Sequence, residues 1–232
     1  MTLPPPDQAL RICVVVPARN EEELVGSCLR ALAEQEGVPY SSYEILLVLD
    51  GPGKGSGHAR RIGMEVACDR LHAVGRPHAL ISSTDADTVV APDWIFAQLA
   101  AAEGGARAIG GRIRLADDGT VPKALLEWHL ARGYSRHRKL LSEPEPAGKT
   151  EHWQFSGASM ALTAEVYRKI GGLEPGDALE DEHLEHALQR HGVPIERLLS
   201  VRVATSAWLV GRANQGLARD LAAVARILDV AE

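Results

Sequence analysis

Two aspartates, Asp85 and Asp87, lie one residue apart in the stretch ISSTDADTVVAPDW, directly after an apolar run. In an extended or turning segment, residues i and i+2 point to the same side, so both carboxylates can converge on one position. A hard cation between them would remove their repulsion and leave positions for phosphate oxygens and water. The alternative is that both are loop and capping residues before Pro92. Their place after an apolar strand favours the metal site.

A second acidic group, Glu180, Asp181 and Glu182, begins a predicted helix in LEDEHLEHALQRHG. The helix dipole stabilises carboxylates at this end, which is a sufficient structural reason for all three. On a helix, however, Asp181 shares a face with Leu184 and Leu188, the face that we expect to be buried. Asp181 is therefore the candidate to face a cleft as a general base.

The same helix carries His183, Glu185 and His186, residue types that bind zinc. Their arrangement, H-L-E-H, matches neither H-E-x-x-H nor H-x-x-E-H. The sequence therefore does not favour a zinc site on this helix.

A glycine-rich stretch, GKGSGHARRIG, precedes a helix that we expect to begin near His58. Glycines before a helix can cradle phosphate, but the pattern matches neither G-x-x-x-x-G-K-[ST] nor a G-x-G-x-x-G that opens the first strand-helix unit. Lys54, Arg60 and Arg61 either neutralise a nucleotide or lie in solvent.

The elements that must position these residues alternate between strand and helix in the first half of the chain. RICVVVP is a continuous apolar run typical of a buried parallel strand, and Asn20 is a plausible N-cap for the helix that follows. YEILLVLDG and HALISS are further strands, and Pro92 fits the first turn of the helix PDWIFAQLAAAE. This alternation predicts a mostly parallel α/β sheet, in which ligands bind at the carboxyl ends of the strands.

The second half has a different pattern. ARAIGGRIRL, HWQFSGASMALT and RLLSVRVAT have strand character, and KALLEWHLARGYSRHRKLL reads as an amphipathic helix. Thr163 is placed to cap the short helix AEVYRKI, which Gly171 and Gly172 end. SEPEPAGK reads as an exposed loop and GLARDLAAVARILDV as a terminal helix. We expect one domain, residues 1–232, without internal repeats.

Composition excludes several classes of protein. The 232 residues are 45% hydrophobic with a formal charge of −6, which gives no electrostatic footprint for nucleic acid. The cysteines Cys13, Cys28 and Cys68 are odd in number and form no C-x-x-C, so we expect free thiols in the core. The N-terminus lacks a secretory signal and no run approaches the ~18 apolar residues of a membrane span. We expect a soluble cytoplasmic protein.

In order along the chain, four of these stretches resemble the family-2 glycosyltransferases of the GT-A fold. VVVPARNEE is similar to the opening strand and P-x-x-N-E turn of that family, and STDADTVVAPDW to its D-x-D strand end. FSGASMALTAEVYRKIGGL is similar to its acceptor-side strand and helix, and LEDEHLEHALQRHG to its E-D helix. The resemblance covers roughly residues 11–195, and VATSAWLVGRANQG also resembles the tail of a bacterial subgroup.

The resemblance implies a fold, a reaction and a set of site residues. It divides the chain into a nucleotide-sugar-binding half at about residues 11–104 and an acceptor-side half at about 105–232, in a metal-dependent transferase. Asp181 would be the base of an inverting transfer, and Asp87, with Asp85, the ligand of Mg²⁺ or Mn²⁺. The donor-binding residues that it implies are Pro17, Arg19, Asn20, Glu21, Asp50, Arg60, Asp85, Ala86, Asp87, Gly157, Ala158 and Arg212.

Several alternatives stay open at this point. In the family a helix and a strand normally separate the second strand's Asp from the glycine and arginine segment, whereas here GPGKGSGHARR follows Asp50 almost at once. Either this unit has been lost or a segment is missing from the sequence. A nucleotidyltransferase, a non-catalytic nucleotide-sugar-binding module and a retaining transfer are the competing functions. The donor sugar, the acceptor and the oligomeric state are not determined, and peripheral contact with a membrane is compatible with the sequence.

Overall fold

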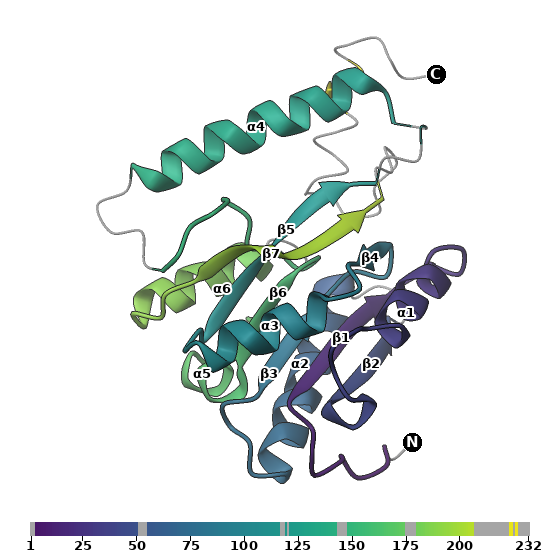
Figure 1. Cartoon of the computed structure of the whole chain (residues 1–232), viewed down its shortest axis with the longest axis vertical. Helices are drawn as coiled ribbons and strands as arrows, with labels where there is room; N and C mark the ends of the chain where they lie inside the picture. The colour runs from purple at the N-terminus through teal and green to yellow at the C-terminus, as the bar shows by residue number, and fades with distance from the viewer. Residues whose placement is uncertain are drawn as a thin grey trace.

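The chain forms a mixed α/β fold in a computed structural model that describes residues 3–50, 55–116, 119, 121–142, 148–174, 180–206, 223, 224 and 226 (Figure 1). The strands are β1 Ile12–Ala18, β2 Tyr43–Leu49, β3 Leu80–Ser83, β4 Thr88–Val90, β5 Ala108–Leu115, β6 Met160–Thr163 and β7 Glu196–Thr205. The helices are α1 Val25–Ala33, the 3-10 turn η1 Tyr40–Ser42, α2 Gly55–Ala73, α3 Trp94–Glu103, α4 Lys123–Leu141, α5 Ala164–Lys169 and α6 Glu180–Arg190.

The seven strands form one sheet in the order β2-β1-β3-β6-β5-β7-β4. β1 pairs in parallel with β2 and β3, and β5 with β7, whereas β6 runs antiparallel to β3 and β5, and β4 antiparallel to β7. Five strands therefore share one direction, and only β4 and β6 oppose it. The mostly parallel α/β sheet expected from the sequence is confirmed, and strands from both predicted halves of the chain belong to it.

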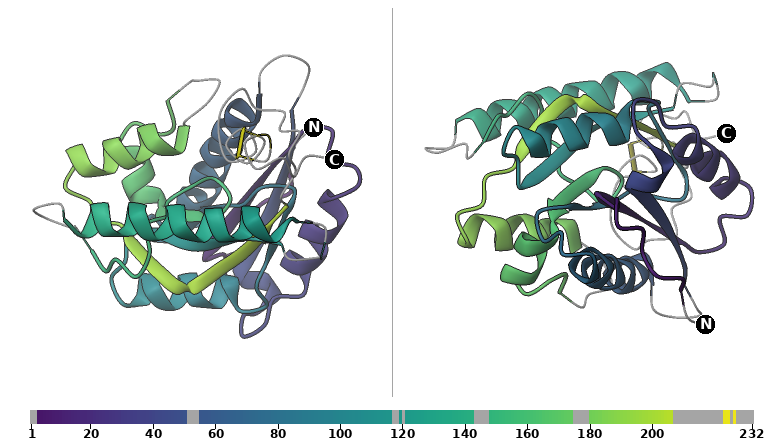
Figure 2. Two further views of the ribbon diagram at one scale, coloured as in Figure 1. Left: turned by 90° about the horizontal axis from the view of Figure 1, so that it is seen from above. Right: turned by 60° about the horizontal axis from the view of Figure 1, so that its bottom comes forward.

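Apolar side chains cover both faces of this sheet. Along β1, Cys13 and Val15 belong to one core, to which helices α2, α5 and α6 also contribute side chains. Val14 and Val16 belong to the other core, to which α1 and α3 contribute. Every residue of β1 is buried, which explains why its sequence is continuously apolar rather than alternating. The views in Figure 2 show the helices on the two sides of the sheet. All three cysteines are buried free thiols, as expected.

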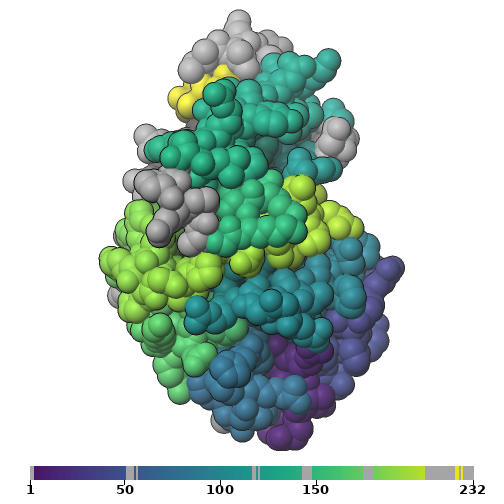
Figure 3. Space-filling view, turned by 60° about the vertical axis from the view of Figure 1, so that its left-hand side comes forward, coloured from purple at the N-terminus to yellow at the C-terminus, as the bar shows by residue number. Residues whose placement is uncertain are grey.

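Helix α4 lies apart from these two cores. None of its residues belongs to either core cluster, and Leu125 is its one fully buried side chain. Figure 3 shows α4 in the upper part of the molecular surface, above β7 and α3. Within the described ranges, no helix combines the length and apolar character that crossing a bilayer requires.

The start of α1 corrects a prediction. Asn20 does not cap this helix: it has a positive φ of 50°, and α1 begins five residues later at Val25, after Leu24. The carbonyl oxygen of Glu21 accepts hydrogen bonds from the N–H groups of both Leu24 and Val25, so a turn intervenes. Asn tolerates the left-handed conformation better than most residues, which makes it suitable for the bend after β1.

Other boundaries also differ from expectation. α2 begins at Gly55 rather than near His58, and α3 begins at Trp94 with Asp93 at the N-cap, so Pro92 precedes the helix. In the segment 152–163 only Met160–Thr163 forms a strand of the sheet. Thr163 caps α5 as predicted, since its Oγ1 accepts a hydrogen bond from the N–H of Val166. Most of the predicted exposed loop and terminal helix lies outside the described residues.

Candidate functional site

The carboxyl ends of β1 and β2 bring Arg19 and Asp50 together. The N–H of Asp50 donates to the carbonyl oxygen of Ala18 at 2.9 Å, which extends the β1–β2 pairing by one residue. Arg19 Nη1 lies 3.6 Å from Asp50 Oδ2, and the side chain of Asp50 is only 2% exposed. Two of the predicted donor-binding residues therefore form an ion pair at one end of the site. Pro17 is buried in β1, two residues before Arg19.

Arg60, from the first turns of α2, lies buried at the centre of the site. Its Nη2 donates to Asp85 Oδ1 at 2.7 Å and its Nε to Glu180 Oε1 at 3.2 Å. Its Nη1 donates to Ser83 Oγ at 2.8 Å and to the carbonyl oxygen of Gly157 at 3.2 Å. One guanidinium thus joins α2, the end of β3, the turn before β6 and the start of α6. The fixed fork of arginine donors suits this bridging, whereas a lysine ammonium would not reproduce it.

Gly157 is where the chain must have no side chain. A β-carbon built at this position would lie 2.5 Å from Arg60 Nη2 and 2.6 Å from its Cζ, closer than such contacts occur in proteins. The neighbouring Ala158 is buried, and its carbonyl oxygen accepts a hydrogen bond from Thr84 Oγ1 at 2.9 Å. Of the two predicted pocket residues, Gly157 therefore borders the Arg60 guanidinium, and Ala158 contacts Thr84 in the segment that leads to the aspartates.

Asp85 and its neighbours give the site a negative charge. Burial raises the pKa of Asp85 to about 6 against the opposing effect of Arg60, and the charges of Asp87, Glu180 and Asp181 raise it further. Burial lowers the pKa of Arg60, but the charges of Asp85, Glu180 and Asp181 raise it by more. We call Asp85, Asp87, Glu180 and Asp181 the carboxylate cluster; it sets four acids against one buried arginine.

Asp87 is held in place by hydroxyl groups. Ser206 Oγ donates to Asp87 Oδ2, and Thr205 Oγ1 lies 3.4 Å from Asp87 Oδ1. These contacts follow from the pairing of β4 with β7, in which Thr88 faces Thr205. Hydroxyl donors supply no opposite charge, so they orient the Asp87 carboxylate without forming an ion pair, in a position set by the sheet.

The site residues fit a hard divalent cation. Carboxylate oxygens are the ligands that Mg²⁺ and Mn²⁺ prefer, and a cation would offset the excess of acids in the carboxylate cluster. In the part of the chain that the structure describes, no three His, Cys, Asp or Glu side chains form a metal cluster. Asp85 and Asp87 would therefore share the ion with phosphate oxygens or water, as Mg²⁺ commonly requires.

Within the carboxylate cluster, Asp181 is half-buried, as its helical position predicts, while the neighbouring Glu182 is exposed. The side chain of Asp181 accepts a hydrogen bond from the N–H of Glu182 at 3.0 Å. Glu180, whose side chain is 13% exposed, is the residue that pairs with Arg60. The first two acids of α6 therefore have different environments: Glu180 is held by an arginine, whereas the carboxylate of Asp181 has no ion pair among the described residues.

The remaining predicted residues are placed as follows. Asn20 and Glu21 form the bend after β1, and Ala86 is buried between the two aspartates. Arg212 and Lys54 lie outside the described residues. Glu185 pairs with the buried Arg197, so this residue serves the structure rather than a zinc site.

Three residues that sequence reasoning did not select belong to the site: Glu180, Ser83 and Ser206. Glu180 was considered only as a helix-start acid, and its neighbour Asp181 was preferred. Ser83 and Ser206 follow or end strands β3 and β7, so the position of each at a strand end was the available signal. The order of strands in the sheet, which decides that Ser206 faces Asp87, is not visible in the sequence.

Comparison with protein families identifies the N-terminal part of the chain. Residues 13–61 match the model of Glycosyl transferase family 2. The matched segment includes β1, β2 and the start of α2 with Arg60, and it crosses the short connection after Asp50. No curated protein sequence matches the chain. The family resemblance is thus confirmed for this segment, which contains the first of the four motifs, VVVPARNEE.

Solved structures with a similar fold are glycosyltransferases of the GT-A type. The fold is similar to that of S. aureus TarS 1–349 in complex with UDP-GlcNAc, with a TM-score of 0.60 and 13% identity over 95% of this chain and 66% of that one. It is also similar to the mannosyltransferase PcManGT from Pyrobaculum calidifontis in complex with GDP-Man and Mn²⁺, with a TM-score of 0.55 and 20% identity over 87% of this chain and 59% of that one. The chain therefore spans less than two thirds of each.

Proposed function

We propose that this chain, with a family-2 segment on a GT-A fold, transfers a sugar from a nucleoside-diphosphate sugar to an acceptor hydroxyl. The observation that carries the proposal is the carboxylate cluster around Arg60 at the carboxyl ends of the strands. Four acids repel a diphosphate on their own, but with a divalent cation they form a binding site for it. The complexes of TarS with UDP-GlcNAc and of PcManGT with GDP-Man and Mn²⁺ are consistent with this reading.

Each side chain has a distinct part in the proposed reaction. Asp87, with Asp85, would hold Mg²⁺ or Mn²⁺, and such an ion would supply positive charge to offset the charge that develops on the leaving nucleoside diphosphate. Arg60 fixes the orientation of Asp85 and neutralises part of the cluster. Arg19 and Asp50 lie where the nucleoside would bind, beside Pro17.

Asp181 is the proposed base. As the bond between the anomeric carbon and the diphosphate oxygen breaks, its electron pair leaves with the diphosphate. The acceptor oxygen forms the new bond to that carbon, and its proton passes to the Asp181 carboxylate. A base and a leaving group on opposite sides of the carbon give inversion. Glu180 cannot replace Asp181 in this role without giving up its ion pair with Arg60.

Binding of UDP and GDP by isothermal titration, in Mn²⁺ and again in EDTA, tests the donor site. We expect one nucleotide to bind only with the metal, and the variant Asp87→Ala to lose this binding. Asp93→Ala, which changes a half-buried aspartate at the N-cap of α3 that pairs with Arg202, is the control and should bind normally. Equal binding by wild type and Asp87→Ala in Mn²⁺ would show that the site is wrongly assigned.

Transfer activity separates catalysis from binding. A thermal-shift screen of nucleotide-sugars with Mn²⁺ first identifies the donor. Asp181→Asn should then bind that donor with wild-type affinity and lose at least ~10²-fold in the rate of transfer, since general-base catalysis typically contributes that much. The neighbouring Glu182→Gln is the matched control, because Glu182 is exposed on the same helix turn. Normal turnover by Asp181→Asn would exclude this base.

The same experiments distinguish the alternatives. A non-catalytic binding module would bind donor and release no nucleoside diphosphate with any acceptor, and a nucleotidyltransferase would release pyrophosphate from a nucleoside triphosphate.

Three free buried thiols fit the reducing conditions of the cytoplasm, where we propose that the protein works.

A further inference from the structure

Helix α4 concentrates positive charge in an acidic protein. Its 19 residues include five basic side chains, Lys123, Arg132, Arg136, Arg138 and Lys139, against one acid, Glu127. With a charge of −6 on the whole chain, the residues outside α4 therefore total −10. Arg132 and Arg136 stack on Trp128 and Trp153, and the helix dipole favours Arg138 and Lys139 in the last turn. No ion pair among the described residues neutralises Arg138 or Lys139, so both charges face outward.

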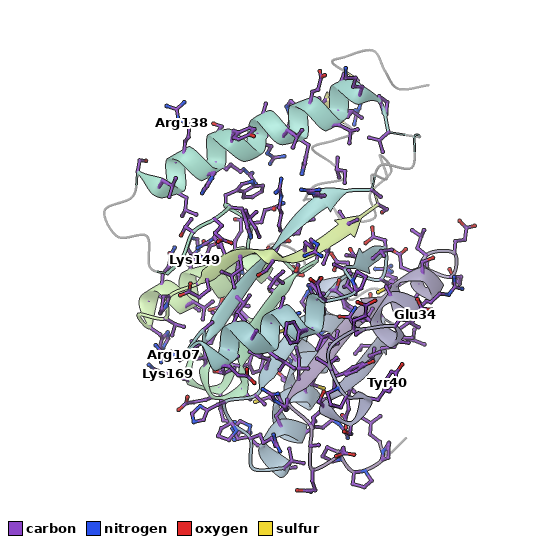
Figure 4. The ribbon with its side chains drawn as sticks, in the orientation of Figure 1. Glu34, Tyr40, Arg107, Arg138, Lys149 and Lys169 are labelled. Carbon is purple, nitrogen blue, oxygen red and sulfur yellow. The ribbon has the colours of Figure 1, made fainter. Side chains whose placement is uncertain are left out.

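One face of α4 also carries apolar side chains into solvent. Leu130, Tyr134 and Leu141 are 53%, 73% and 53% exposed, and spacings of four and seven residues place them on one side of the helix. Arg138 lies beside them and points away from the body of the molecule near the end of α4 (Figure 4). We call this surface, made by Leu130, Tyr134, Arg138, Lys139 and Leu141, the outer face of α4.

The opposite side of the helix is already occupied. Leu125 is fully buried, the Arg136 guanidinium stacks 4.5 Å from the Trp153 ring centroid, and His137 Nε2 lies 3.1 Å from the carbonyl oxygen of Thr150. These contacts fix the rotation of α4 about its own axis. The apolar side chains therefore cannot turn inward without breaking them.

We propose that the outer face of α4 docks onto the surface of an anionic lipid bilayer. Exposed leucine and tyrosine side chains flanked by arginine and lysine are the composition of helices that lie in the interface plane of a membrane. The basic side chains are attracted to anionic headgroups, while their aliphatic stems allow the apolar residues to enter the acyl boundary. A second copy of this chain fits less well, because two such faces would bring the four cationic side chains of two Arg138–Lys139 pairs together. Nucleic acid offers no environment for the three apolar side chains.

This inference does not depend on the proposed function, since it uses no residue of the carboxylate cluster. If both hold, the enzyme acts on acceptors at a membrane surface. Donor binding measured in the absence of lipid provides the separate readout: it should be the same in wild type and in every α4 variant below.

Vesicle co-sedimentation of the full chain tests the proposal. We expect binding to vesicles of 70% phosphatidylcholine and 30% phosphatidylglycerol at 0.1 M NaCl, and at least about tenfold weaker binding to pure phosphatidylcholine or at 0.5 M NaCl, because each basic residue near the surface contributes about fivefold. Arg138→Glu with Lys139→Glu should reduce binding to the anionic vesicles by about tenfold or more. The double variant Tyr134→Ser with Leu141→Ser should also reduce binding to the anionic vesicles by about tenfold or more, because it removes apolar contact with the bilayer.

Tyr40→Ser is the matched control, since Tyr40 is 75% exposed on η1, far from α4 (Figure 4). It should bind vesicles as the wild type does. Absence of sedimentation with anionic vesicles, or an equal loss in Tyr40→Ser, would overturn the proposal. So would light scattering that shows a dimer which Tyr134→Ser with Leu141→Ser dissociates, because a second copy would then cover the outer face.

Discussion

Helices α2 and α4 are both 19 residues long, yet the fold uses them in opposite ways. α2 buries Met64, Ala67 and Leu71 against the sheet and carries Arg60 into the carboxylate cluster. α4 has one fully buried residue and directs most of its cations outward. The comparison shows that an arginine's surroundings, rather than its helix, decide its role: a buried one organises the protein's own acids, and an exposed one is available to other molecules.

Replacing one arginine in each helix should produce the largest difference between the two helices, measured as the loss of unfolding free energy. Arg60→Met leaves Asp85 and Glu180 without their buried partner, and removal of one member of a buried pair typically costs about 3–5 kcal/mol of unfolding free energy. Urea denaturation measures this. Arg138→Met on α4 is the counterpart and should change stability by less than about 0.5 kcal/mol. Similar losses in the two variants would contradict the comparison.

Acid should weaken the region beneath α4 through His152. Its Nδ1 accepts from the N–H of Gln154 at 3.0 Å, while Nε2 faces the carbonyl oxygen of Leu198 at 3.2 Å, so the fold holds the neutral ring. Burial lowers the pKa of His152 to about 4, helped by the charges of Arg197, Arg112 and His137.

The direction in which stability changes with pH follows from this pKa. His152 binds a proton near pH 6.5 in the unfolded chain and near pH 4 in the fold, so stability is full above pH 6.5 and falls by up to about 3 kcal/mol as the pH drops to 4. Asp85, with its pKa raised to about 6, titrates with the opposite sign. The measurement is therefore the difference between wild type and His152→Gln in urea midpoints from pH 4 to 7. A constant difference would exclude His152 as the source.

Glycine substitutions compare the packing of the two helices. A β-carbon at Gly63 of α2 would overlap Val15 Cγ1 and lie 2.9 Å from Val48 Cγ2, so Gly63→Ala should cost about 1–3 kcal/mol. At Gly133 of α4 the nearest atom is Trp153 Nε1 at 3.1 Å, and alanine also favours helix by up to about 1 kcal/mol. Gly133→Ala should thus stay within about 1 kcal/mol of wild type in thermal unfolding. The reverse order would mean that α4 is the more tightly packed helix.

The smallest effect is expected on the outer face of α4. Tyr134→Ser removes a side chain that is 73% exposed, and surface changes of this kind usually alter unfolding free energy by less than about 0.5 kcal/mol. Urea denaturation of the purified variant checks this. A loss above about 1 kcal/mol would show that Tyr134 belongs to the fold rather than to a free surface.

Strands and helices with a strong pattern were predictable from the sequence. The continuous apolar runs of β1 and β3, the periodicity of α4 and the Thr163 cap of α5 all lie where local sequence places them. β4 was missed because its three residues, Thr88–Val90, are too few to give a pattern, and they form a strand only by pairing with β7.

The candidate site was predictable in its parts and not in its connections. Strand ends supplied Asp50, Asp85 and Asp87, and helical phase selected Asp181. The sequence was equally compatible with Arg60 as a solvent-exposed cation. Its role depends on four segments that come together only in the folded chain. Whether the selected residues bind donor, metal and acceptor as proposed stays a prediction.

The pairing of β4 with β7 has a consequence for how the protein is made. Asp87 emerges from the ribosome more than a hundred residues before Thr205 and Ser206, the hydroxyl partners that orient it. The three parallel strands β1, β2 and β3 can assemble early, but Asp87 acquires its final position only when β7 joins the sheet. A truncated or stalled chain would therefore contain both aspartates and still lack a competent site.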